Sequence, residues 1–213
     1  MATNNTTLAD FIWKNADDLW GDFQHVDFGK IILPFTLLRR LECVLESTRE
    51  KVLSTMKAMQ DRPIDLDIVL PQITGFSFYN SSEYSLATLG ATRTRQNLED
   101  YIAKFSGNAR VIFEQFDFTN TLARMDRAGV LYRICQNFAA IDLHPSTVPD
   151  RVMSNVYEHL IRRFGSEVNE AAGQQVGQTS TGSLDGLASD KRHPKGGIHH
   201  SALLGQCHAS ARW

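Results

Sequence analysis

The chain has 213 residues, of which 42% are hydrophobic and 22% are charged. This size and composition predict one domain with a real hydrophobic core, alone or with an appendage. Its 22 basic and 24 acidic side chains give a net charge of −2, which excludes a uniformly basic surface. The sequence contains no run of about 18 apolar residues, so we expect no membrane-spanning helix.

Apolar residues at helical spacing begin near the amino terminus. In residues 7–20 they recur every three or four positions, Thr7 is placed as an N-terminal cap, and Gly21 is placed to end the helix. Residues 28–59 carry the longest amphipathic pattern in the chain, with a broad apolar stripe. Pro34 either kinks this predicted helix or marks its true start.

The helical pattern is lost between residues 61 and 90, where we expect loops with at most a small β element. It returns in residues 93–105, 109–116 and 120–143. A last helix is predicted to begin at Pro149, whose ring suits a first turn, and Gly165 is placed to end it. The pattern as a whole predicts a mostly α domain of about six or seven helices.

Composition changes abruptly after residue 173. Residues 174–213 hold 6 of the 14 glycines and 4 of the 7 histidines, with Trp213 as their single aromatic residue. Their 4 bases and 2 acids give a charge of +2, so residues 1–173 carry −4. Such a stretch buries too little apolar surface to offset the entropy lost on ordering its backbone. We therefore predict a helical domain over residues 1–173 and a disordered tail over residues 174–213.

The sequence contains no catalytic or cofactor-binding pattern. Glycine-rich phosphate loops, the GxSxG elbow, CxxC pairs and HExxH are all absent. The tail holds several potential metal ligands, but their spacing follows no zinc pattern and we expect no metal site: His193, His199, His200, Cys207 and His208. Cys43 and Cys135 lie in apolar helical patterns and are predicted core residues. The odd number of cysteines fits a reduced, cytoplasmic protein.

Positive charge on the predicted helices is the remaining feature. Arg39 and Arg40 follow an apolar run, Lys30 lies earlier in the same pattern, and Arg93 and Arg95 precede the next helical stretch. Arginine and lysine in such positions bind phosphate groups. These five residues are therefore candidate phosphate contacts, although their spacing alone favours ordinary solvated charges.

Residues 11–46 resemble the N-terminal helical domain of the modification (M) subunit of type I restriction–modification systems. They read FIWKNADDLWGDFQHVDFGKIILPFTLLRRLECVLE. Further matching parts follow in the order found in that family: FYNSSEYSL, NLEDYIAKFSGNARVIFEQFDF, LYRICQNFAAIDL and VMSNVYEHLIRRFGSEVNEAAG. The resemblance covers residues 8–173.

This resemblance implies an adenine-specific DNA methyltransferase that uses S-adenosylmethionine and flips its target base. It implies assembly with a specificity (S) subunit, a second M subunit and a restriction (R) subunit, in which the helical domains help to close a clamp on DNA. Lys30, Arg39, Arg40, Arg93 and Arg95 then become candidate DNA contacts. Because residues 1–173 carry −4, we expect this chain alone to bind DNA weakly.

The chain departs from the family after Gly173, where a methyltransferase domain would follow and the unrelated tail begins instead. The catalytic Asn-Pro-Pro-Phe/Tyr motif is absent, because no two prolines are adjacent. We therefore expect a truncated M subunit that keeps the clamp and assembly domain and has no catalytic residue, cofactor site or metal. The alternatives are a stand-alone helical protein that interferes with a resident type I system, or a non-functional fragment.

Overall fold

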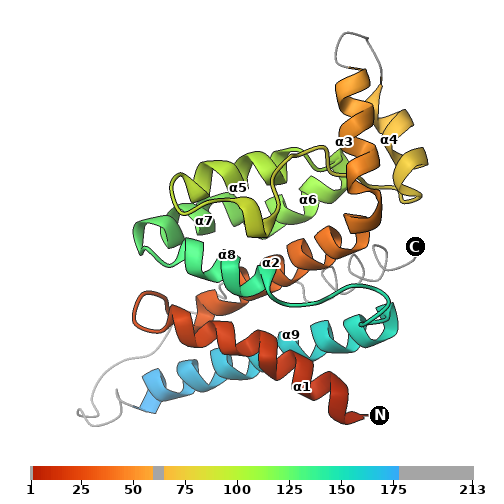
Figure 1. Cartoon of the computed structure of the whole chain (residues 1–213). Helices are drawn as coiled ribbons and strands as arrows, with labels where there is room; N and C mark the ends of the chain where they lie inside the picture. Colours follow the sequence, from red (N-terminus) through yellow and green to blue (C-terminus); the bar gives the residue numbers. More distant parts are fainter. Residues whose placement is uncertain (1, 60–64, 178–213) are drawn as a thin grey trace, which may run out of the picture.

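The computed structural model describes residues 2–59 and 65–177. These residues form a helical domain (Figure 1), so the mostly α architecture expected from the sequence is confirmed. Within the described ranges no strand forms, and two isolated bridges, Trp20 to Phe23 and Asn80 to Phe105, are the β structure present.

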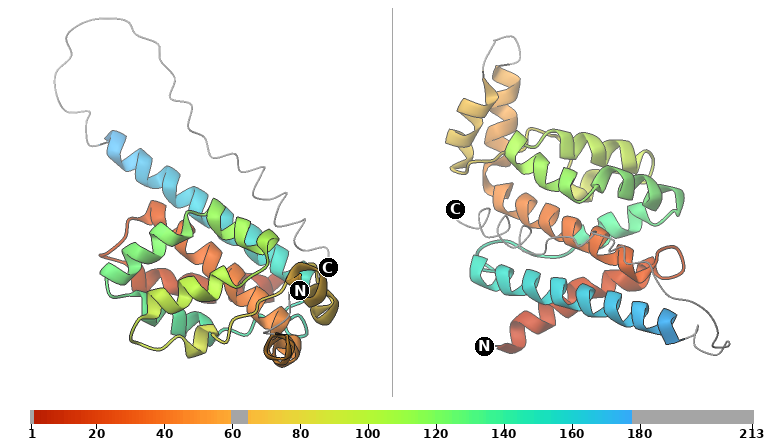
Figure 2. Two further views of the ribbon diagram at one scale, coloured as in Figure 1. Left: turned by 90° about the horizontal axis from the view of Figure 1, so that it is seen from above. Right: turned by 180° about the vertical axis from the view of Figure 1, so that it is seen from behind.

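The helices lie in two groups on either side of α2, with α1 and α9 on one side and α5, α6 and α7 on the other (Figures 1 and 2). Their bounds are α1 (Ala2–Trp13), α2 (His25–Leu45), α3 (Arg49–Ala58), α4 (Leu66–Thr74), α5 (Thr94–Ala103), α6 (Gly107–Gln115), α7 (Phe118–Arg127), α8 (Leu131–Ala139) and α9 (Asp150–Gly177). Short 3-10 helices lie between them: η1 (Lys14–Leu19), η2 (Glu46–Thr48) and η3 (Leu86–Thr88).

The central position of α2 follows from its apolar sequence, since a helix that is hydrophobic on most faces must be covered on most faces. More than half of its residues are buried, and it packs against α1, α7, α8 and α9. The fully buried Phe35 ring lies 5.2 Å from the ring of Phe118 on α7 and 5.3 Å from that of Phe138 on α8. Pro34 lies inside the helix, so it does not mark the start.

α9 packs across α1 and α2. Gly29 of α2 permits this close approach, because a Cβ at that position would lie 3.2 Å from Cγ of Phe164 on α9. The Phe164 ring lies 4.7 Å from the Trp13 ring of α1. The guanidinium of Arg163 lies 4.1 Å from the centre of the Trp13 ring, and its Nη1 donates to Oδ1 of Asp10 at 2.7 Å. These contacts make α9 part of the domain core as far as residue 164.

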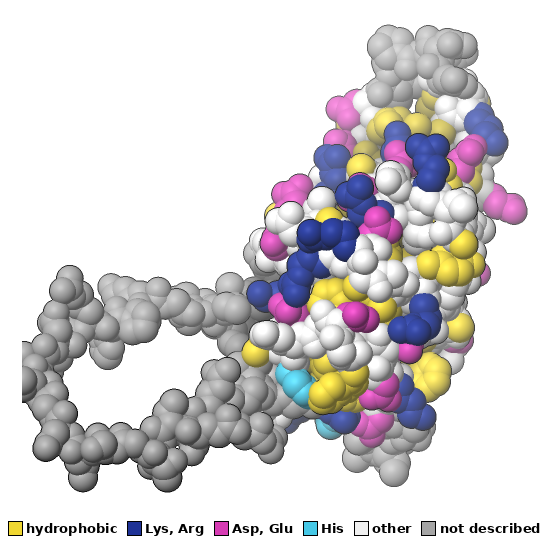
Figure 3. Space-filling model, turned by 90° about the vertical axis from the view of Figure 1, so that its left-hand side faces the viewer, with side chains coloured by type: hydrophobic (Ala, Val, Ile, Leu, Met, Phe, Trp, Pro, Cys, Tyr) yellow, Lys and Arg dark blue, Asp and Glu magenta, His cyan; other side chains and the backbone are white. Residues whose placement is uncertain are grey.

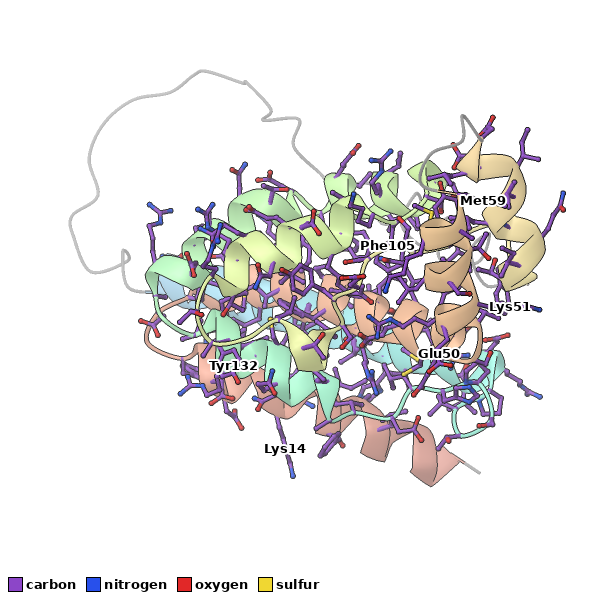
Figure 4. All side chains as sticks on the ribbon, turned by 45° about the horizontal axis from the view of Figure 1, so that its top comes forward. Lys14, Glu50, Lys51, Met59, Phe105 and Tyr132 are labelled. Atoms are coloured by element: carbon purple, nitrogen blue, oxygen red, sulfur yellow. The ribbon has the colours of Figure 1, made fainter. Side chains whose placement is uncertain are left out.

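α3 and α4 form an arm that projects from the body of the domain (Figure 1). Val52, Leu70 and Tyr79 are the buried residues of its small core, which is separate from the main core. The hydroxyl of Tyr79 donates to Oδ1 of Asp67 at 2.7 Å, which ties α4 to the loop that follows it. In Figure 4, Met59 lies at the far end of the arm.

The first two predicted helices differ from the structure in their bounds. α1 begins at Ala2, so Thr7 lies inside it and is not the cap. The pattern over residues 28–59 is divided by η2 into α2 and α3, because the apolar side chains of α3 pack with α4 instead of the main core.

A helix forms where the sequence predicted loops. Residues 66–74 fold as α4, whose N-cap Asp65 accepts a hydrogen bond from the backbone N–H of Asp67 at 3.0 Å. Gly75 ends the helix in the left-handed region at φ +74°. The sequence pattern hid this helix because Pro71, normally a helix breaker, lies within it.

The prediction that Gly165 ends the last helix is wrong, because α9 continues to Gly177. Glycine ends a helix where the backbone turns left-handed, and the described glycines with positive φ are Gly21, Gly75, Gly90 and Gly129. Residues 174–177 of the predicted tail therefore belong to α9. Residues 178–213 lie outside the described residues, so the boundary after residue 173 stays a prediction.

Substitution of Phe35 tests the assignment of the core. We expect Phe35→Ala to lower the free energy of unfolding by about 3–5 kcal/mol, since it removes apolar contacts and leaves a cavity. Phe11→Ala removes the same atoms from a side chain that is 50% exposed, and we expect a change within about 0.5 kcal/mol. Urea denaturation followed by circular dichroism measures both changes, and equal losses would contradict the assigned core.

Candidate functional site

Arg40, a predicted DNA contact, lies inside the domain. Its Nη1 donates to the carbonyl oxygens of Leu143 at 2.5 Å and Val148 at 2.7 Å, and its Nη2 pairs with Oδ1 of Asp150. The Arg40 side chain is only 8% exposed. These partners replace the water that a buried guanidinium loses. Arg40 thereby clamps the connection between α8 and α9 onto α2.

Arg39 also bonds within the chain. Its Nε donates to the carbonyl of Ile141 at 2.7 Å and its Nη1 to Oε2 of Glu42 at 2.8 Å. Oε1 of Glu42 accepts from the backbone N–H of Leu86 at 2.8 Å. Burial opposes the charge of Arg39, but the hydrogen bond and charge of Glu42 outweigh it and raise its pKa. These bonds hold both guanidinium groups against the domain, with 18% of the Arg39 side chain and 8% of the Arg40 side chain exposed.

The other three candidates group with two arginines that the sequence patterns did not single out. Asp27 pairs with Arg124 and lies near Lys30, and Asp126 pairs with Arg95. We name this set the basic face: Lys30 of α2, Arg93 and Arg95 at the start of α5, and Arg124 and Arg127 of α7. Figure 3 shows the side of the molecule that lies on the left in Figure 1, where Lys and Arg side chains follow one another with acidic side chains between them. The fold therefore brings together cations that are almost 100 positions apart in the sequence.

An ion pair joins the α2 and α7 parts of the basic face. Nη2 of Arg124 lies 2.7 Å from Oδ2 of Asp27, and the same guanidinium lies 5.1 Å from the centre of the Phe23 ring. The hydrogen bond from Arg124, helped by the charge of Lys30 and opposed by burial, lowers the pKa of Asp27. The same bond raises the pKa of Arg124.

A second set of ion pairs joins the α5 and α7 parts. Nε of Arg95 lies 3.3 Å from Oδ2 of Asp126, and its Nη1 lies 3.3 Å from Oε1 of Glu99. Arg127 follows Asp126 directly and is exposed. Among the described residues, Arg93 and Arg127 make no ion pair. At this end of the face, Arg95 is paired with carboxylates, whereas the guanidinium groups of Arg93 and Arg127 have no ion-pair partner among the described residues.

The turn before α5 positions Arg93. This residue is the N-cap of α5 in a left-handed conformation with φ 62°, and its side chain makes no capping bond. Oγ1 of Thr94 donates to the carbonyl of Gly90 at 2.7 Å, and Nδ2 of Asn97 donates to that of Leu89 at 2.7 Å. These bonds fix the backbone of the turn and leave Arg93 exposed.

The basic face is positive although the whole chain is not. Its five cations and the three acids paired with them or beside them, Asp27, Glu99 and Asp126, give 5 − 3 = +2. The whole chain carries −2. Guanidinium groups in such a setting bind phosphate oxygens but supply no acid–base chemistry.

Sequence reasoning missed Arg124 and Arg127, although a signal was available. Their spacing of three places both on one side of a helix. What the sequence does not contain is the proximity of Asp126 to Arg95, because it depends on how α5 packs on α7.

Two cysteines and one tyrosine are ionisable groups inside the domain. Cys43 and Cys135 are buried as predicted, and burial raises the pKa of the Cys135 thiol to about 12. Burial likewise raises the pKa of Tyr101 well above its ordinary value. In the part of the chain that the structure describes, no three His, Cys, Asp or Glu side chains are placed to hold a metal ion. The five potential ligands of the tail lie outside that part.

Comparison with known families identifies the domain. A family model described as the HsdM N-terminal domain matches residues 8–138, well over half of the chain. The chain belongs to this family. HsdM is the modification subunit of type I restriction–modification systems, so the resemblance stated from the sequence is confirmed. No curated protein and no solved structure matches the chain. None of the helices in residues 2–59 and 65–177 combines the length and apolar character needed to cross a bilayer.

The HsdM match and the packed domain end at different places. The match stops at residue 138, within α8. The partners of Arg40 lie at 143, 148 and 150, and the core contacts of α9 extend to Phe164. The HsdM domain of this chain is therefore packed together with the α8–α9 connection and the first half of α9.

Removing the Arg40 clamp should destabilise the domain. We expect Arg40→Met to lower the free energy of unfolding by about 2–4 kcal/mol, since the carbonyls of Leu143 and Val148 lose their donors. Asp150→Asn weakens only the partner that is 51% exposed, so we expect a loss of at most about 1 kcal/mol. Urea denaturation measures both. A loss in Arg40→Met no larger than in Asp150→Asn would contradict the clamp.

The ion pair of Asp27 should make stability depend on pH. Because the folded-state pKa of Asp27 is lowered, its contribution is present at neutral pH and is lost as the pH falls below the ordinary value of 3.8. We expect Asp27→Asn to cost about 0.5–1 kcal/mol at neutral pH and progressively less in acid. Urea denaturation at several pH values measures this. A deficit that stays constant in acid would argue against the ion pair.

Proposed function

We propose that these 213 residues act as the helical N-terminal module of a type I modification subunit, which joins subunits and holds DNA but does not transfer methyl groups. The match of residues 8–138 to the HsdM N-terminal domain is the observation that carries this proposal. The lack of adjacent prolines and of a glycine-rich cofactor loop supports its second part. Methyl transfer from S-adenosylmethionine is thus proposed to reside outside these residues.

The proposed protein partners are the S subunit, a second M subunit and the R subunit of a type I complex. The centres of protein interfaces are more apolar than the rest of the protein surface. The two most exposed large apolar side chains among the described residues lie on separate parts of the domain. Trp20, which is 58% exposed, lies between α1 and α2, with its ring held edge-on to His25 at 4.2 Å. Ile68, which is 61% exposed, lies on the α3–α4 arm. We propose both as subunit contacts.

The proposed nucleic-acid partner is duplex DNA, and the cytoplasm is the proposed location. Of the five predicted contacts, the geometry supports Lys30, Arg93 and Arg95 better than Arg39 and Arg40, whose donors are engaged inside the domain. The net charge of −2 supports weak binding by this chain alone.

Association with type I subunits tests the assembly role. The tagged full chain is co-expressed with the S subunit and an intact M subunit, and we expect it to co-purify with them on size-exclusion chromatography. Trp20→Ala with Ile68→Ala should weaken this association. Val111→Ala, which truncates another exposed side chain on α6, is the matched control. Failure of the unaltered chain to associate with either subunit would refute the assembly role.

A methylation assay tests the absence of catalysis. With labelled S-adenosylmethionine and unmodified DNA, we expect no incorporation by the chain alone, whereas an intact M–S complex serves as the positive control. Methyl transfer by the chain alone would overturn the proposal. Inhibition of the intact complex by added chain would instead favour the interfering protein.

A further inference from the structure

We propose that the basic face binds the sugar-phosphate backbone of duplex DNA without regard to sequence, and that Asp126 limits the strength of this binding. The inference rests on the proposed function, from which the class of partner is taken. It assigns a role to Arg124, Arg127 and Asp126, none of which the sequence patterns singled out.

The first argument is the availability of the cations. Lys30, Arg93 and Arg127 are exposed, and no ion pair engages them among the described residues. Arg95 and Arg124 have carboxylate partners but remain partly exposed, at 34% and 43% of their side chains. All five can therefore reach phosphates without unfolding of the domain, in contrast to Arg39 and Arg40.

The second argument is the distribution of these cations over three helices. α2, α5 and α7 each supply at least one, and Lys30, Arg93 and Arg127 among them are exposed. A spread row of cations can neutralise successive phosphates of a duplex and release their counterions. Contacts of this kind position a protein on DNA but carry no sequence information. Phosphate contacts of this kind fit the proposed function, in which the S subunit recognises the DNA sequence.

The third argument concerns Asp126, which lies between two of the cations. Its Oδ2 is 3.3 Å from Nε of Arg95, and Arg127 is its neighbour in the chain. A phosphate that approaches Arg95 must compete with this carboxylate. Loss of its charge raises the net charge of the face from +2 to 2 + 1 = +3 and frees one guanidinium edge. Asp126 is therefore placed to keep the affinity low.

The test measures binding of the full chain to a fluorescent duplex of roughly 30 base pairs, by anisotropy at several salt concentrations. Arg93→Gln with Arg127→Gln removes two unshared cations. We expect weaker binding and a slope of log K against log salt that is smaller by about 0.9 for each phosphate that is no longer neutralised. Lys51→Gln with Arg151→Gln makes the same charge change at exposed positions on α3 and α9 and should leave the slope unchanged. Figure 4 shows Lys51 on the α3–α4 arm.

Asp126→Asn provides a gain that structural damage cannot imitate. We expect it to strengthen binding several-fold and to steepen the salt dependence by about one further phosphate, because Nε of Arg95 loses its carboxylate partner while Nη1 keeps Glu99. Glu50→Gln removes an equal charge from the exposed surface of α3 and is the matched control (Figure 4). Equal gains in the two variants would show that net charge alone matters and would overturn the role of Asp126.

The remaining outcomes decide the site and its partner. Reductions in affinity that are as large in the Lys51/Arg151 variant as in the Arg93/Arg127 variant would overturn the basic face. Binding of poly-L-glutamate with no binding of the duplex would assign the face to an acidic protein. Failure of subunit association with intact DNA binding would reject the assembly role and leave this surface standing. Normal association without DNA binding would overturn the basic face and leave the assembly role standing.

Discussion

The buried guanidinium of Arg40 is the interaction on which the arrangement of the domain depends. It lies on the central helix and bonds to two carbonyls and one carboxylate of the segment from 143 to 150. The carbonyls of Leu143 and Val148 compensate the desolvation of this charge, so its bonds hold the connection between α8 and α9 on one path over α2. That path delivers α9 to its place across α1 and α2, where Phe164 meets Gly29 and Trp13.

The same constraint explains why positive charge on a helix is by itself a poor guide to function. Arg39 and Arg40 follow FTLL in the most characteristic part of the sequence, yet both serve the fold. Lys30 lies on the same helix and is exposed. Whether a base faces a partner or the protein interior is decided by the loops that fold back onto the helix, and these lie about 100 residues further along the chain.

The distribution of surface charge in this domain depends on ion pairing between helices as well as on the net charge. Residues 1–173 carry more acids than bases, and one arginine from each of α5, α7 and α8 meets an acid from another helix: Arg95, Arg124 and Arg133. Exposed pairs of this kind contribute little stability each. They nevertheless determine where positive potential remains, and at the basic face three cations are left over. A nearly neutral protein can therefore present one attractive surface to a polyanion.

The sequence by itself determined the helical class, the family and the burial of Cys43 and Cys135, because these follow from apolar spacing and from motifs that are local. It also placed Lys30, Arg93 and Arg95 among the candidates. It did not predict α4, because Pro71 lies inside that helix. It also predicted that the last helix ends at Gly165, although α9 continues through this residue. Only the tertiary structure decided that Arg40 is buried and that Arg124 and Arg127 join the others on one face. The physical reason is that burial and ion pairing are set by packing between distant segments, such as Asp126 against Arg95, and no local pattern encodes such a distance.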